Sequence, residues 1–176
     1  MNAEKYTQKA LEAVKTAQNM AQENGNQYVT TEHLLYALLD QDGGLIGSLF
    51  GKMGVDCDGL LSELDTLIRK LPRISGGSGE VYASPETGKI LNLAEKTAEK
   101  LHDDYISVEH LMLAIFSEGS QNVRQLLSGH GITRSRFSDE LSKVKTSPVT
   151  SDNPEDSYDA LKKYGTDLVE RARTKE

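Results

Sequence analysis

The sequence has a single cysteine and no long apolar run, and both shortages exclude whole classes of protein. Cys57 cannot form an intramolecular disulfide, which is typical of a reducing compartment, so a cytoplasmic location is expected. No segment approaches the ~18 consecutive apolar residues of a membrane-spanning helix, and residues 1–5 lack the apolar stretch of a signal peptide. No membrane partner is expected.

Positive charge is also scarce. The chain of 176 residues has 20 Lys and Arg against 27 Asp and Glu, which gives a formal net charge of −7. Binding to nucleic acid through its phosphates requires a basic stripe on the surface, so nucleic acid is not an expected partner.

Catalytic motifs are missing as well. The glycine-rich residues 76–79 are followed by Glu80, so neither a phosphate-binding loop nor a G-x-S-x-G nucleophile elbow is complete. Cys57 stands between two aspartates, whose charges raise the pKa of a thiol. His33 and His110 are each followed four residues later by alanine, so the spacing of a helical zinc site is absent. We expect no enzyme and no metal; a hydrolase using either histidine is the rival hypothesis.

An internal duplication is the clearest positive signal. Residues 7–64 align without a gap with residues 84–141, with 11 identities in 58 pairs, and the match is densest between 28–37 and 105–114. Two copies favour a pseudo-twofold pair over a solenoid, which needs at least three units.

Each copy has the pattern of four helices. Apolar residues recur at three- and four-residue spacing behind the N-cap candidates Thr7 and Ser84, and again behind Thr30 and Ser107. The predicted fold is all-α, with eight helices in two pseudo-twofold-related four-helix repeats, about 7–71 and 84–145, in a domain spanning 1–145. A flexible linker is expected over 146–156, and residues 157–176 have the pattern of the start of another domain.

The Glu-His pair of each repeat allows two interpretations. Glu32 and Glu109 fall near the second position of a predicted helix, where a carboxylate interacts favourably with the positive helix end, and His33 and His110 fall at the third, where they can cap it. Alternatively, the two carboxylates are matched acceptors for cationic groups on a ligand.

Leu93 also has two interpretations. On a helical wheel it lies well outside the centre of the apolar face, and Leu91 lies at one margin. Leu93 either contacts the other repeat or lines an apolar groove. Such a groove would be rimmed by Asp103, Asp104 and Glu109 and suited to extended segments with apolar and basic side chains.

The paired segments 31–35 and 108–112, joined by the stretch 71–76, resemble the duplicated N-terminal domain of Clp ATPases. Residues 160–168 are similar to the opening of the first AAA+ module of ClpB-type disaggregases, so 157–176 resembles a truncated start of that module.

This resemblance implies a domain that captures exposed apolar segments of unfolded or aggregated proteins for a hexameric ATPase. The resemblance also implies that this chain binds no cofactor, and that ATP and Mg²⁺ are bound by AAA+ modules outside this sequence. The implied alternative is a ClpC-type N-domain that docks an adaptor protein or phosphoarginine through Glu32 and Glu109. By this resemblance, six residues of this chain match the substrate-binding positions of ClpB-type domains: Thr7, Leu91, Leu93, Asp103, Glu109 and His110. The position of His110 is apolar in some members of the family.

Overall fold

The computed structural model describes residues 2–74 and 79–155, and its regular elements are almost all helical. A 3-10 helix, η1 (Ala3–Lys5), precedes the two repeats. The first repeat contains α1 (Gln8–Glu23), α2 (Thr31–Leu39), α3 (Leu45–Lys52) and α4 (Cys57–Arg69). The second contains α5 (Pro85–Lys100), α6 (Val108–Glu118), α7 (Gln121–Gly129) and α8 (Arg134–Val144). The eight predicted helices are thus confirmed. The predicted start of another domain, at 157–176, lies outside the described part of the chain.

Local sequence signals set the beginnings of the helices. The side chains of Thr7 and Ser84 accept hydrogen bonds from the backbone N–H three residues later, as N-caps do. At α2 and α6, Thr30 and Ser107 form capping boxes with the histidines at the third helical position. Both predicted cap pairs are confirmed.

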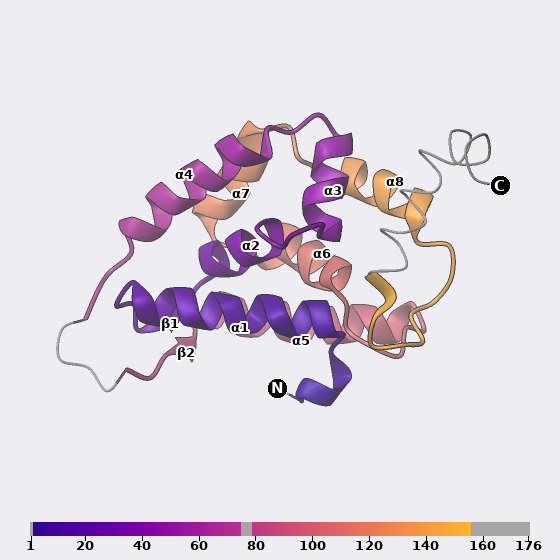
Figure 1. Cartoon of the computed structure of the whole chain (residues 1–176), viewed down its shortest axis with the longest axis horizontal. Helices are drawn as coiled ribbons and strands as arrows, with labels where there is room; N and C mark the ends of the chain where they lie inside the picture. The colour runs from indigo at the N-terminus through magenta and orange to yellow at the C-terminus, as the bar shows by residue number, and fades with distance from the viewer. Residues whose placement is uncertain (1, 75–78, 156–176) are drawn as a thin grey trace, which may run out of the picture.

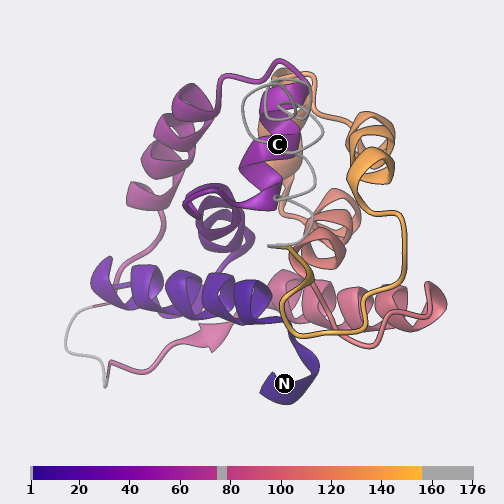
Figure 2. The same cartoon turned by 45° about the vertical axis from the view of Figure 1, so that its right-hand side comes forward.

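The helices form layers around a central pair. In Figures 1 and 2 the long helices α1 and α5 lie along one side, α2 and α6 lie in the middle, and the other four helices lie beyond them. This placement explains why α2 and α6 are apolar around most of their circumference: they pack against neighbours on several sides. Within the described residues, no helix is long and apolar enough to cross a membrane.

Short strand contacts record the pseudo-twofold relation. The strands β1 (Tyr28–Val29) and β2 (Tyr82–Ala83) pair in parallel, with Val29 opposite Ala83. A second parallel bridge joins Tyr6 to Ile106. Adding the offset of 77 converts position 6 into 83 and 29 into 106, so each contact is the symmetry mate of the other. The composition did not predict these strands.

The space between the repeats is filled by core side chains. The buried apolar residues of both repeats form one continuous cluster. At its centre Phe50 of α3 meets Phe137 of α8 edge to face, with ring centroids 6.2 Å apart. The two halves thus bury their apolar faces against each other at the centre, while at the surface a pocket of about 420 Å³ lies between α4 of the first repeat and α7 of the second, with Leu67 and Leu126 among its lining residues.

Residues 145–155, called the strap below, pack against the domain. Val149 is only 1% exposed and Glu155 only 3%. The backbone N–H of Asp104 donates to Val149 O (2.8 Å), and that of Gln8 donates to Asp152 O (2.8 Å). We expected a flexible linker over 146–156, but residues 146–155 are packed against the domain. This segment is too polar to build a core of its own, and one aliphatic side chain and a series of hydrogen bonds hold it in place. In Figure 2 this segment descends from α8 to the layer of α1 and α5.

Candidate functional site

A buried ion cluster lies where α5, α6 and the strap meet. Asp103 Oδ2 accepts hydrogen bonds from Lys145 Nζ (2.6 Å) and from His110 Nε2 (2.7 Å), and Asp103 Oδ1 accepts one from the backbone N–H of Val149 (2.7 Å). Glu109 Oε2 lies 3.0 Å from the same ammonium. Three predicted site residues, Asp103, Glu109 and His110, are thus brought together around a lysine.

The protonation states in this cluster follow from burial and charge. Burial lowers the pKa of His110. His110 Nδ1 accepts the Ser107 backbone N–H (2.9 Å), so in the neutral ring Nε2 carries the proton given to Asp103. Burial opposes ionisation of Asp103 and Lys145, but the hydrogen bonds to Asp103 lower its pKa and the two carboxylates raise that of Lys145. The cluster is a cation held by two carboxylates.

The same cluster has the donor atoms of a metal site. One ligand atom each from Asp103, Glu109 and His110 lies within 4.8 Å of the others. The Lys145 ammonium is bonded to both carboxylates, so a metal ion would have to displace it. The arrangement therefore favours an organic cation over a metal.

An apolar pocket of about 270 Å³ opens beside this cluster. Leu101 and Leu113 line it together with Leu141 of α8, and the strap closes one side with residues 145–148. Leu101 is 48% exposed, an unusual value for a large apolar side chain in this domain. Asp103 and Glu109 also line the pocket. The predicted combination of apolar surface and acidic groups is present here, within the second repeat.

The two groove leucines point to different surfaces. Positions 91 and 93 are separated by about 200° around a helix, so they leave opposite margins of α5. Leu93 is partly buried and packs against the core cluster, and it does not line the 270 Å³ pocket. Leu91 lines a separate pocket of about 380 Å³ with Tyr6 and Ile106. Among the described residues, no pocket contains both leucines, so a groove shared by them stays a prediction.

Thr7 lies under the far end of the strap. It is fully buried, and its hydroxyl donates to Glu155 Oε2 at 2.6 Å. The same carboxylate oxygen accepts the backbone N–H of Val108 at 3.0 Å. Burial and the nearby charge of Glu109 raise the pKa of Glu155 to about 7. Thr7 is therefore covered by the chain itself.

The raised pKa of Glu155 predicts a pH-dependent stability. The pKa of Glu155 in the folded state lies above its ordinary value of 4.5, so protonated Glu155 stabilises the folded state. This contribution to the free energy of unfolding is fully present below about pH 4.5 and is lost as the pH rises through about 7. Urea unfolding between pH 5 and 8 should show Glu155→Gln gaining stability relative to the wild type as the pH rises. Glu12→Gln, which removes the same charge from an exposed site on α1, should show a constant difference.

The first repeat keeps the geometry of the second without its ion cluster. His33 Nδ1 accepts the Thr30 backbone N–H (3.0 Å) and Nε2 donates to Asn26 Oδ1 (3.0 Å), and burial lowers the pKa of His33 to about 4. Glu32 is 3% exposed, and the hydroxyls of Thr31 and Ser120 donate to its Oε1, each at 3.3 Å. Both histidines thus cap helices, and Glu32 is not open to a large cationic ligand.

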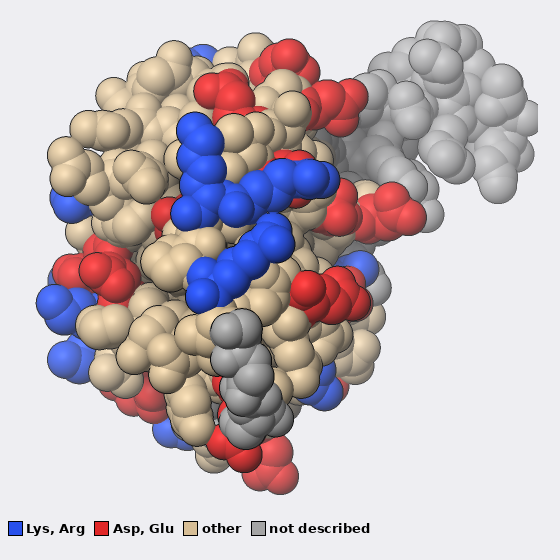
Figure 3. All heavy atoms as spheres, turned by 90° about the vertical axis from the view of Figure 1, so that its left-hand side faces the viewer, with Lys and Arg blue, Asp and Glu red and all other residues tan. Residues whose placement is uncertain are grey.

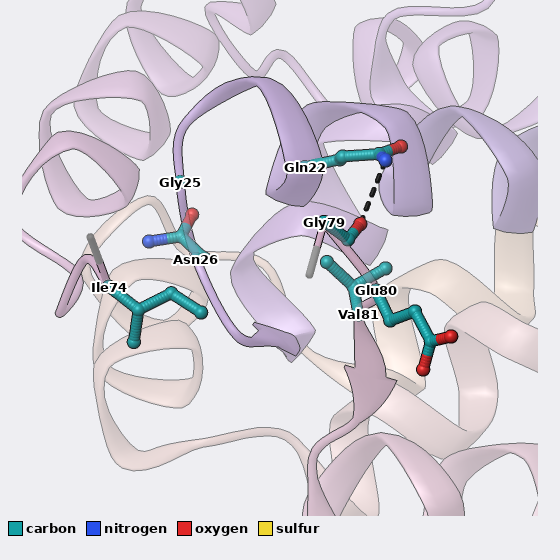
Figure 4. A pocket seen from close by; sticks show the side chains of 7 residues that line it. All are labelled: Gln22, Gly25, Asn26, Ile74, Gly79, Glu80 and Val81. Carbon is teal, nitrogen blue, oxygen red and sulfur yellow. Dashed lines mark hydrogen bonds between the residues drawn. The ribbon is translucent and has the colours of Figure 1, made fainter. Parts of the chain in front are cut away.

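The remaining surface shows a pocket and a charged face. Figure 4 shows a pocket between the end of α1 and residues 74 and 79–81, which lie between the repeats; there Gln22 Nε2 donates to Gly79 O (2.8 Å). Its volume is about 240 Å³. Asn26, which also lines it, is engaged with His33 and with Pro72 O. On the face in Figure 3, a few basic side chains cross the middle and acidic ones surround them, so charge of both signs is mixed there. None of the predicted binding residues lines the pocket in Figure 4.

Comparison with known proteins gives this architecture a family. The Clp repeat (R) N-terminal domain family matches residues 5–130. The chain belongs to this family. The N-domain is 42% identical over 177 residues to the chaperone protein ClpB of Bacillus cereus and 38% identical over 176 residues to that of Brucella suis. Each match covers 98% of this chain but only 20% of the relative, so the sequence spans about a fifth of their length.

Solved structures of other Clp N-domains share the fold. The Hsp104 N-terminal domain from Candida albicans superimposes with a TM-score of 0.76 at 16% identity, covering 85% of this chain and 98% of that one. A complex of the ClpV N-domain with a VipB peptide gives a TM-score of 0.64 at 19% identity, covering 87% and 91%. At these identities the likeness shows the fold alone.

Several residues of this N-domain site escaped the sequence reasoning. Leu113 and Leu141 occur at the spacing of ordinary core positions, so the sequence does not distinguish them from other core residues. Lys145 has the pattern of a basic residue at the end of an amphipathic helix. Val149 and Glu155 lie in a stretch that composition classes as a linker. An isolated aliphatic residue within such a stretch was the only available signal.

Proposed function

We propose that this chain is the substrate-binding N-terminal domain of an ATP-driven ClpB-type disaggregase. It takes up exposed segments of unfolded or aggregated proteins that combine apolar and basic side chains. The observation that carries the proposal is the 270 Å³ pocket, in which apolar walls stand beside the carboxylates of Asp103 and Glu109. Apolar contact supplies affinity in such a site, and the two carboxylates, which are paired with Lys145 in this structure, favour a cationic side chain that takes the place of that lysine.

The relatives support this assignment. The proteins of 42% and 38% identity are ClpB chaperones, and a structural neighbour, the ClpV N-domain, is in complex with a peptide. The alternative of adaptor or phosphoarginine docking through both Glu32 and Glu109 is less well supported, because two separate buried carboxylates would have to open: Glu32, which is hydrogen-bonded to Ser120, and Glu109, which is paired with Lys145. ATP and Mg²⁺ would be bound by AAA+ modules outside this sequence. We also propose a cytoplasmic location, because a single cysteine is typical of a reducing compartment.

A single domain of this kind binds weakly. Burying one leucine side chain against a ligand contributes about 1.5–3 kcal/mol, whereas association costs an estimated 4–15 kcal/mol. Six domains on a hexamer would retain a client through their high effective concentration. Weak individual contacts then allow the client to be passed on to the motor.

Leu101→Asp tests the pocket directly. Leu101 is half exposed, so its replacement should leave the fold intact while placing a charge beside two carboxylates. We expect binding of a reduced, unfolded test protein to weaken about tenfold or more, since the lost burial corresponds to at least ~1.4 kcal/mol. Fluorescence anisotropy with the labelled test protein measures this, and circular dichroism checks the fold.

Ile74→Asp is the matched control. Ile74 is 44% exposed, its backbone N–H donates to Gly25 O just after α1, and it does not line the 270 Å³ pocket. The Ile74→Asp variant should bind the test protein as the wild type does. Leu93→Asp should show a smaller loss of affinity than Leu101→Asp. Equal affinity of Leu101→Asp and the wild type would remove the pocket from the binding site. Turnover of a chromogenic ester that is lost in His110→Ala would instead favour the hydrolase hypothesis.

A further inference from the structure

The strap forms one wall of the candidate site and contacts the domain there as a bound peptide would. At its start, the Lys145 ammonium lies between the carboxylates of Asp103 and Glu109. Four residues later the Val149 side chain is buried against the domain, although it does not itself line the 270 Å³ pocket. A client segment with a cation and an aliphatic side chain at this spacing would make both contacts in place of the strap.

Backbone contacts complete the likeness. The Val149 N–H donates to Asp103 Oδ1 and its carbonyl accepts the N–H of Asp104, so both polar groups of one strap residue are satisfied by the domain. Further along, Asp152 O accepts the N–H of Gln8, and Glu155 accepts from Thr7 and Val108. Such main-chain bonds hold an extended segment whatever its sequence.

We propose that residues 145–155 are a displaceable internal competitor for the substrate site, and that a client segment binds by replacing them. The proposal rests on the proposed function and adds to it a ligand class and a form of autoinhibition. The ligand class is an extended segment with Lys or Arg four residues before an aliphatic residue. A cation is required because, once Lys145 leaves, the buried carboxylates of Asp103 and Glu109 need another partner.

The strap sets the apparent affinity through its population. If only a fraction of the molecules has the strap open, the observed dissociation constant equals the intrinsic one divided by that fraction. Val149 is the buried anchor of the strap, so its replacement by a charged residue should raise the open fraction. The domain core does not depend on this contact alone, because its continuous cluster extends through both repeats.

The test compares Val149→Asp with Thr150→Asp in the full 176-residue chain. Both introduce the same charge in the strap, but Thr150 is exposed. The probe is a fluorescein-labelled peptide with Lys four residues before Val in an otherwise Ser- and Leu-containing sequence. We expect Val149→Asp to bind it about tenfold more tightly than the wild type and Thr150→Asp to bind it as the wild type does. Val149→Ser provides a milder variant if Val149→Asp fails to fold.

Amide hydrogen exchange of the wild type reports displacement directly. Saturating peptide should increase exchange at Val149, whose N–H donates to Asp103 Oδ1 and loses that acceptor when the strap leaves, while leaving the core of α2 unchanged. The same peptide with norleucine in place of Lys should neither bind nor increase this exchange. Each of these results would support competition by the strap.

The outcomes separate the two proposals. Peptide binding that is equal in the wild type and Val149→Asp, with unchanged exchange at Val149 of the wild type, overturns the internal competitor but leaves the proposed function standing. Absence of binding in every folded variant overturns the proposed function. Tight binding of the norleucine peptide would contradict the requirement for a cation.

Discussion

Lys145→Met is expected to lower the free energy of unfolding by about 3–5 kcal/mol, because it leaves buried carboxylates without their cation. The side chains of Asp103 and Glu109 are fully buried, and Lys145 is the ammonium that pairs with both. Methionine preserves most of the apolar length of lysine, so the loss is electrostatic. Urea denaturation at neutral pH, followed by circular dichroism, measures the change.

Lys143→Met is the matched control for this prediction. Lys143 lies on the same helix, two residues earlier, and makes an exposed pair with Glu140 at 3.2 Å. Exposed pairs contribute about 0–1 kcal/mol, so this variant should unfold near the wild-type midpoint. Similar destabilisation by both substitutions would mean that the general loss of positive charge, rather than the buried cluster, is responsible.

A loss of similar size, about 3–5 kcal/mol, is expected for Phe137→Ala. Phe137 of α8 is fully buried and contacts Phe50 of the first repeat and Phe116 of the second, the latter with ring centroids 5.7 Å apart. Truncation removes the aromatic group that joins the repeats and leaves a cavity that the surrounding helices cannot fill completely. The shift of the urea midpoint measures this effect.

Phe116→Ala serves as its comparison. Phe116 is only partly buried, so the same truncation should cost clearly less. Both variants should unfold in one transition, because the apolar residues of the two repeats form a single cluster. Separate transitions for the two repeats in Phe137→Ala would contradict that view of the core.

Local signals were sufficient for most of the fold. The three- and four-residue spacing of apolar residues behind Thr7 predicts one buried stripe, and the structure buries that stripe of α1: Ala10, Ala13, Val14, Ala17 and Ala21. The left-handed glycines that follow α3 and α7, Gly54 and Gly131, have φ of 80° and 70°. Such features are set by neighbours within a turn or two of the chain, so spacing and residue type are enough to predict them.

The candidate site was predicted less completely. Asp103, Glu109 and His110 do gather, but in a buried cluster in which Lys145 pairs with both carboxylates, rather than as the open acidic rim of a groove. The helical wheel put Leu91 and Leu93 outside the centre of the apolar face, but it could not say which neighbours stand at each margin. That depends on packing between helices distant in the sequence.

The sequence by itself determined the duplication, the eight helices, their caps and the residue types available to a ligand, because these depend on periodicity and on contacts close along the chain. Only the tertiary structure decided what is exposed. Thr7 and Val149 are separated by most of the sequence, and both are buried where the strap folds back over the domain. Contacts over such separations depend on shape and hydrogen-bonding partners that no local pattern encodes.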